Sequence, residues 1–136
     1  MNSTMKVGGY VIDDGGNRVQ FPTYSNPSAE QVLTTLELAK DKVAVVGMKV
    51  IPEPEVGPYH LTVETEGGKY FVSLQEYSLS GENDVRTLTG ASADGDRVDI
   101  FGDTYDSASI TTEFQIIKEI FLEFLAKGDV SRALLS

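Results

Sequence analysis

The stretch EVGPYHLTVETEGGKYFVSLQEY, residues 55–77, holds two runs of alternating side chains separated by Gly67-Gly68. Alternation assigns the apolar side chains of the first run to one face of a strand: Tyr59, Leu61 and Val63. The polar side chains of that run fall on the other face: His60, Thr62 and Glu64. Because a two-residue glycine loop between such runs is typical of a tight turn, the stretch predicts a β-hairpin with Glu66 opposite Lys69.

Further strands are predicted on both sides of this hairpin. Residues 6–12 (KVGGYVI) and 17–21 (NRVQF) flank a turn-forming run that ends in Gly15-Gly16, which predicts another hairpin. The β-branched run 42–51 predicts a strand that stops at the proline-rich loop 52–58. Two more strands are expected at 85–90 and 97–102, separated by the turn-rich segment 91–96.

A first helix is predicted within residues 25–42. Either Asn26 caps it, with Pro27 at the first helical position, or Ser28 caps it, with Gln31 three residues on. Its apolar stripe comprises Ala29, Val32, Leu33, Leu36 and Ala39.

A second helix is predicted from Thr112 to Lys127. Thr112 and Gln115 have the spacing of a capping box, and Gly128 is suited to a left-handed helix end. Its apolar face comprises Phe114, Ile117, Ile120, Phe121, Phe124 and Leu125.

This order of elements predicts the α+β class. We expect a single domain over residues 1–136, with a mainly antiparallel, twisted β-sheet, two helices, and the C-terminal amphipathic helix packed on the sheet. A chain of 136 residues is long enough to bury a core without cross-links, and it contains no cysteine.

The charge is strongly negative and unevenly distributed. The formal net charge is −10, and the segment from Glu53 to Asp106 supplies nine of the ten net negative charges. Such a surface repels phosphate backbones and anionic lipid headgroups and attracts a basic macromolecule. We therefore expect neither a nucleic-acid nor a membrane partner. Because the N-terminal stretch lacks the pattern of a secretory signal and no apolar run is long enough to span a membrane, we expect a soluble, cytoplasmic protein.

Catalytic and metal-binding patterns are weak in this sequence. His60 is the only histidine, and Glu64, four residues or roughly 13 Å farther along the strand, is poorly placed to orient it. We predict no catalytic residue, no cofactor site and no metal site. The carboxylates from Asp94 to Asp106 offer oxygen ligands without the order of a calcium-binding loop, so an adventitious calcium site there stays open.

The later part of the chain resembles a known group of proteins. GPYHLTVETEGGKYFVSLQEY, followed by VDIFGDTYDSASITTEFQIIKEIFLEFLAKGD, is similar to small bacterial immunity proteins of polymorphic-toxin and contact-dependent growth inhibition systems. The similarity lies in a meander of strands, a strand that ends in Gly102 with Tyr105 soon after, and a terminal amphipathic helix followed by glycine. It implies a non-enzymatic protein that binds a cognate toxin domain, in many cases a basic nuclease, and blocks its active site.

An acidic face suits that role, because it speeds association with a basic partner while buried aromatic anchors set the affinity. The predicted partner-binding carboxylates are Glu53, Glu55, Glu64, Glu66, Glu76, Asp94, Asp96, Asp99, Asp103 and Asp106. The predicted aromatic anchors are Tyr59, Tyr77 and Tyr105, of which Tyr59 is expected more readily in the core. Two alternatives stay open: a small enzyme or ligand-binding protein that uses the sheet face around His60, and an oligomeric scaffold subunit.

Overall fold

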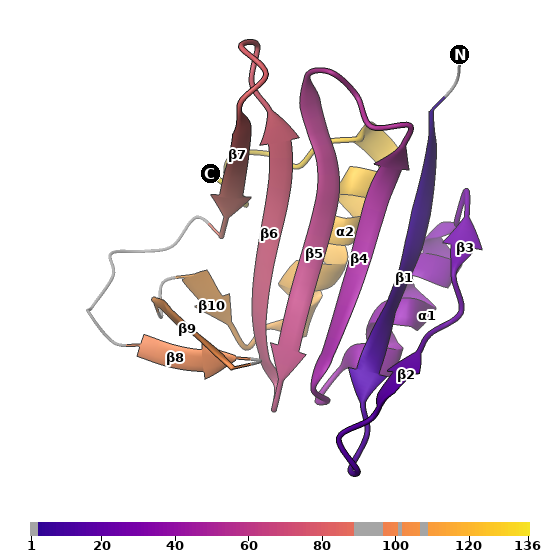
Figure 1. The fold of residues 1–136 in the computed structure, drawn as a ribbon, viewed down its shortest axis with the longest axis vertical. Coiled ribbons are helices and arrows are strands. Elements are labelled where there is room, and N and C mark those ends of the chain that lie inside the picture. Colours follow the sequence, from indigo (N-terminus) through magenta and orange to yellow (C-terminus); the bar gives the residue numbers. More distant parts are fainter. Residues whose placement is uncertain (1–2, 89–96, 101, 107–108) are drawn as a thin grey trace.

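The computed structural model of the chain describes residues 3–88, 97–100, 102–106 and 109–136, without the side chains of Arg97, Val98 and Asp106. It has two helices and a mainly antiparallel sheet, with a C-terminal helix, in one small α+β domain (Figure 1). The predicted fold class is therefore confirmed.

Four long strands form the middle of the main sheet, in the order β6 (Lys69–Tyr77), β5 (Gly57–Glu66), β4 (Ala44–Ile51) and β1 (Thr4–Ile12). Two short strands pair along each edge of this sheet. Along β1 these are β2 (Arg18–Gln20) and β3 (Tyr24–Ser25), and along β6 they are β7 (Asn83–Thr87) and β10 (Ile110–Thr111). A separate two-stranded hairpin consists of β8 (Arg97–Ile100) and β9 (Asp103–Asp106).

The two predicted hairpins are confirmed, and Glu66 pairs with Lys69 across the glycine turn. The strand predicted at 97–102 is wrong at its end, because the chain turns after Ile100 and forms a hairpin apart from the main sheet. The strand predicted at 85–90 begins earlier, at Asn83. The predicted turn segment 91–96 lies outside the described residues.

The predicted alternation fails at Tyr59. The pairing of β5 with β6 shifts register between Pro58 and His60, which is the geometry of a β-bulge. The ring of Tyr59 stacks on that of Tyr77, which shares the face of Gln75 and His60. Tyr59 therefore lies on the face opposite to Leu61, and its expected core position is wrong.

Helix α1 (Ala29–Ala39) begins with the second of the two predicted caps. The hydroxyl of Ser28 accepts a hydrogen bond from the backbone N–H of Gln31, and the Gln31 side chain accepts one from the backbone N–H of Ser28. Asn26 instead has a positive φ of 50°. Ala29 is exposed, so its predicted place in the apolar stripe is wrong.

Helix α2 (Phe114–Lys127) starts without the predicted capping box. The chain leaves β10 only at Thr111, whose hydroxyl accepts the N–H of Glu113, and the helix follows with no side-chain cap. At the other end, Gly128 has a φ of 71° and its N–H bonds to the carbonyl of Phe124. The predicted left-handed end is confirmed.

Both helices lie on the same side of the sheet (Figure 1). Helix α1 packs on β1 and β4, and α2 packs on β5 and β6. Each large apolar side chain buried between them contributes roughly 1.5–3 kcal/mol before entropy is subtracted. The fully buried members include Val32, Leu36, Met48, Leu61, Tyr70, Leu74, Ile117, Phe121 and Phe124. The other side of the main sheet, which we call the open face, is not covered by either helix.

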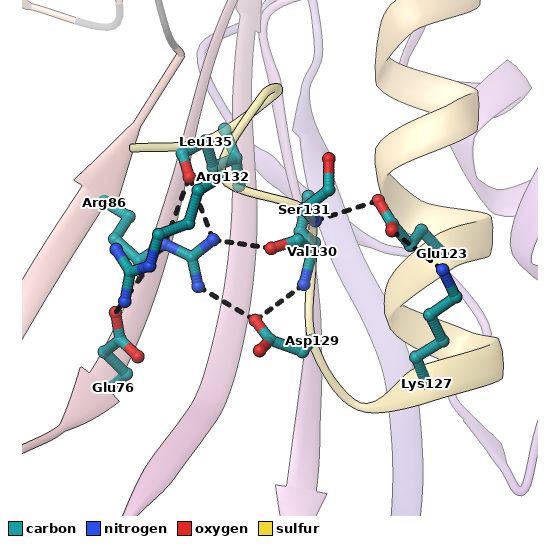
Figure 2. Close-up of polar contacts among 9 residues, drawn as sticks. All are labelled: Glu76, Arg86, Glu123, Lys127, Asp129, Val130, Ser131, Arg132 and Leu135. Atoms are coloured by element: carbon teal, nitrogen blue, oxygen red, sulfur yellow. Dashed lines mark hydrogen bonds and ion pairs between the residues drawn. The ribbon is translucent and has the colours of Figure 1, made fainter.

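Arg86 fastens the C-terminal residues to β7 (Figure 2). The Arg86 guanidinium is buried and donates hydrogen bonds to the Asp129 carboxylate and to the backbone carbonyls of Val130 and Leu135. Glu76 lies 3.6 Å from Arg86 and also accepts a hydrogen bond from Arg132. This network has a structural role, because nearly all of its donors bond to backbone carbonyls or to carboxylates that are paired within it.

Candidate functional site

The open face is organised in rows that cross the central strands. One row contains Lys6, Lys49 and His60, on β1, β4 and β5. The next row is made of small side chains, which begin with Gly8 and Gly47 on β1 and β4. It continues through Thr62, Ser73 and Thr87 on β5, β6 and β7. The side chains of this second row are short.

A group that we call the Tyr77 cluster stands at one end of the open face: Glu53, Tyr59, Tyr77 and Asn83. The rings of Tyr59 and Tyr77 stack with centroids 4.5 Å apart. The Tyr77 hydroxyl donates to a Glu53 carboxylate oxygen at 2.6 Å, and the Tyr59 hydroxyl donates to the Asn83 amide oxygen at 2.7 Å. The hydrogen bond to Glu53 raises the pKa of Tyr77 to about 12. Since both hydroxyls are bonded, the two rings are held in one orientation.

A second group, the Tyr105 cluster, lies where the β8–β9 hairpin meets the sheet: Glu64, Phe71, Asp103 and Tyr105. The Tyr105 ring stacks on Phe71 at 3.9 Å between centroids, and its hydroxyl donates to a Glu64 carboxylate oxygen at 3.2 Å. Burial, followed by the charge of Glu64, raises the pKa of Tyr105 to about 12. Burial also raises the pKa of Glu64, and the charge of Asp103 acts in the same direction, while the hydrogen bond from Tyr105 opposes them.

The raised pKa of Glu64 predicts a pH-dependent cost to stability. The folded state holds the Glu64 proton more tightly than the unfolded state, so the stabilisation from protonated Glu64 is full below its unfolded pKa and is lost as the pH rises. Replacing Glu64 with glutamine should therefore raise the urea midpoint of unfolding at pH 7 relative to the native protein. The difference should vanish near pH 4, where native Glu64 is protonated. Circular dichroism at both pH values measures it.

Glu66→Gln is the matched control, because Glu66 lies two residues farther along the same face of β5, opposite Lys69. Its effect on the unfolding free energy should stay within about 0.5 kcal/mol at either pH. A Glu64→Gln protein that is less stable than the native protein at pH 7 would contradict the burial of this carboxylate as the dominant effect.

His60 lies at the edge of two adjoining hollows on the open face. One, of about 280 Å³, is lined by Lys49, Glu53, Tyr59 and His60 among others. The other, of about 380 Å³, extends over Gly8 and Gly47. His60 Nε2 lies 3.3 Å from the Thr62 hydroxyl. Burial lowers the pKa of His60 and nearby Lys49 lowers it further, while a Gln75 hydrogen bond and the charge of Glu53 oppose this.

The predicted partner-binding residues are divided between several places. Glu53, Tyr59 and Tyr77 come together in the Tyr77 cluster, and Glu64, Asp103 and Tyr105 come together in the Tyr105 cluster. Glu66 lies at the end of the open face, Glu55 is exposed in the loop before β5, and Asp99 is exposed on β8. Asp94 and Asp96 lie outside the described residues, as does the Asp106 side chain.

Glu76 alternates onto the helix side of β6 and pairs with Arg86 and Arg132, so its charge is neutralised away from the open face. Lys6 and Lys49 were missed because they lie outside the acid-rich segment, and the pairing of β1 with β4 is what places them beside His60. Asn83 and Phe71 were also missed, since their roles depend on contacts with Tyr59 and Tyr105.

Within the described ranges, no three histidine, aspartate or glutamate side chains gather as candidate metal ligands. Neither described helix is long and apolar enough to cross a membrane.

These features define a small α+β protein with two helices on one side of an antiparallel sheet and a structured polar surface on the other. Over residues 4–134 the chain belongs to the family described as "Family of unknown function (DUF6911)". It is similar to the crystal structure of a hypothetical protein from Neisseria gonorrhoeae, with 31% identity and a TM-score of 0.87 over 95% of this chain and 91% of that one. No curated protein matches the chain.

Proposed function

We propose that this protein is a cytoplasmic immunity protein that binds a cognate toxin domain through its open face and blocks the toxin's active site. The observation that carries the proposal is the Tyr77 cluster, an aromatic pair held in place beside a carboxylate on a sheet face that the helices leave uncovered. Aromatic side chains fixed before binding are the usual anchors of protein interfaces, because little conformational entropy is lost when they are buried.

The size of the open face also supports this proposal. Strand β5 has ten residues and therefore runs for about 33 Å, and neighbouring strands are about 4.8 Å apart. A face of that length across four strands approaches the area that each partner contributes to a standard interface, roughly 800 Å².

The charge supports a basic partner. The chain carries a net charge of −10, and Glu53 supplies a carboxylate directly beside the stacked tyrosines. An arginine or lysine of the partner can lie against the Tyr77 ring and pair with Glu53 at the same time. No chemistry is required of the immunity protein, since occupation of the toxin's site is sufficient for inhibition.

The proposal is tested by co-expression with a toxin domain, which we expect to be encoded by the gene next to this one. We expect the protein to restore growth of bacteria that produce that domain, and the purified pair to form a complex. Association should slow steeply as salt rises from about 50 to 500 mM, because the Debye length shrinks from roughly 14 to 4 Å. Failure of the native protein to protect the cells and to bind the toxin domain would exclude this function.

Charge reversal tests which side of the molecule attracts the partner. The double variant Glu53→Lys, Glu55→Lys should lower the association rate at low salt by about 10-fold, since both residues lie in the exposed loop beside the open face. Stopped-flow fluorescence with a labelled toxin domain measures the rate.

The matched control is Glu37→Lys, Glu119→Lys, which makes the same change in net charge on the exposed surfaces of the two helices. Its effect should stay below about 3-fold, because its charges lie on the helices, on the side of the sheet away from the docked partner. Equal effects of the two double variants would mean that the partner does not approach the open face.

A further inference from the structure

Three cationic or ionisable residues stand side by side in the middle of this acidic protein. Lys6 on β1 lies directly opposite Lys49 on β4, and Lys49 lies directly opposite His60 on β5. We call these three residues the lysine row. Like charges that face one another across neighbouring strands repel, so this arrangement disfavours the free protein.

In the described part of the chain, ion pairs are formed by Arg86, Lys127 and Arg132. No carboxylate in residues 3–88, 97–100, 102–106 or 109–136 is recorded within ion-pair distance of Lys6 or Lys49, and several other lysines of these ranges are likewise unpaired. What distinguishes Lys6 and Lys49 is that they face each other directly across neighbouring strands. Acidic residues outnumber basic ones by 21 to 11 in this sequence, so the unpaired lysines do not result from a shortage of carboxylates.

The lysine row stands beside an empty space of suitable size. The hollow of about 380 Å³ has Gly8 and Gly47 in its floor and Lys6, Lys49 and His60 along its side. A side chain at Gly47 would crowd this arrangement, since an added Cβ would come within 3.1 Å of His60 Nε2. Glycine at this position therefore lets the imidazole lie over β4 beside the lysines.

The hollow opens on the same face as the Tyr77 cluster and continues towards it. The neighbouring hollow shares Lys49 and His60 and extends to Glu53 and Tyr59. The positive charges of the lysine row thus lie next to the negative charge of Glu53. A partner that docks here meets both.

We infer that the hollow beside the lysine row receives an acidic side chain of the partner protein, whose carboxylate pairs with Lys6 and Lys49 next to His60. This inference rests on the proposed function and names the chemistry of its partner. The toxin domain then presents a base to the Tyr77 cluster and an acid to the lysine row. Two opposite charges at fixed places on one face set the orientation of docking and reject partners that carry only positive charge.

The lysine row can be tested in the free protein with a peptide probe. The probe is acetyl-Asp-Asp-amide, titrated into ¹⁵N-labelled protein at pH 7 and low salt, with acetyl-Asn-Asn-amide as the uncharged control. We expect saturable shifts of the amides of Gly8, Gly47 and His60 with the acidic probe and none with the control. Because His60 is the sole histidine, its ring signals report on the site without overlap.

The variant Lys6→Gln, Lys49→Gln should weaken binding of the acidic probe at least 10-fold. Lys42→Gln is the matched control, since Lys42 is exposed on the connection between α1 and β4, and it should leave the affinity unchanged. Shifts that are absent, that spread over the whole surface, or that persist in the double variant would overturn the inference. Inorganic phosphate is titrated separately, and tighter binding of phosphate than of the peptide would overturn it in favour of a small-anion site.

The toxin domain separates this inference from the function on which it rests. If the native protein binds the toxin domain and protects the cells, Lys49→Glu should lower the affinity for the toxin domain at least 10-fold. Lys42→Glu should not lower it. If Lys49→Glu binds and protects like the native protein, the lysine row is not part of the interface, although the immunity function stands. If the native protein neither binds nor protects, the function itself fails, whatever the peptide titration shows.

Discussion

Replacing Arg86 with methionine should lower the free energy of unfolding by about 3–5 kcal/mol, the usual cost of removing one partner from a buried ionic network. The side chain is 4% exposed and supplies hydrogen bonds to Asp129 and to the carbonyls of Val130 and Leu135. Methionine fills much of the same volume, so the loss reports on the missing donors and not on a cavity. Urea unfolding followed by circular dichroism measures it.

Two further variants define what Arg86 contributes. Arg86→Lys keeps the charge but loses the planar fork that reaches two carbonyls, so its cost should fall between those of the native protein and the methionine variant. Lys127→Met removes an exposed ion pair with Glu123 and should cost no more than about 0.5 kcal/mol. A loss below about 1 kcal/mol for Arg86→Met would show that the C-terminal residues are held mainly by their apolar contacts.

If the protein acts as proposed, replacing Tyr77 with alanine should weaken binding of the toxin domain at least 30-fold, or about 2 kcal/mol, which is the threshold for an interface hot spot. The substitution removes one ring of the stacked pair and the hydrogen bond that holds the Glu53 carboxylate. Most of the loss should lie in the dissociation rate, since the net charge is unchanged. Surface plasmon resonance with immobilised toxin domain measures both rates.

Tyr77→Phe separates the ring from its hydroxyl. It keeps the stacking on Tyr59 but frees the Glu53 carboxylate, so its effect should be smaller than that of Tyr77→Ala. Leu38→Ala is the control for loss of an exposed apolar side chain elsewhere, because Leu38 lies on α1 and is 41% exposed. Similar affinities of Tyr77→Ala and Leu38→Ala would remove the Tyr77 cluster from the interface.

The elements that could be predicted from sequence are those whose signals are local. The turn at Gly67-Gly68, the capping box of Ser28 and Gln31, and the left-handed Gly128 each depend on a few neighbouring residues, and the structure contains all three. The capping box predicted at Thr112 fails because β10 keeps Thr111 extended, a tertiary constraint that overrides the local pattern.

The candidate site could be predicted only in part, because it is assembled by pairing between strands. Tyr59 lies on the open face because of a β-bulge that has no recognisable sequence pattern. The alternation rule therefore assigns Tyr59 to the core. The lysine row exists only because β1 pairs with β4 in a register that brings Lys6 to Lys49. Similarly, the concentration of acidic residues does not indicate that Glu76 is neutralised by arginines from β7 and the C-terminal segment.

The short edge strands of the main sheet affect whether copies of the protein associate at high concentration. A long, exposed edge strand is a template for fibril growth, because its unpaired backbone N–H and C=O groups can pair with the next copy. Here the edge strands β2, β3, β7 and β10 have at most five residues each, and Thr87 exchanges backbone hydrogen bonds with Ser136. Short edge strands of this kind reduce the tendency of copies to pair edge to edge and polymerise at high concentration.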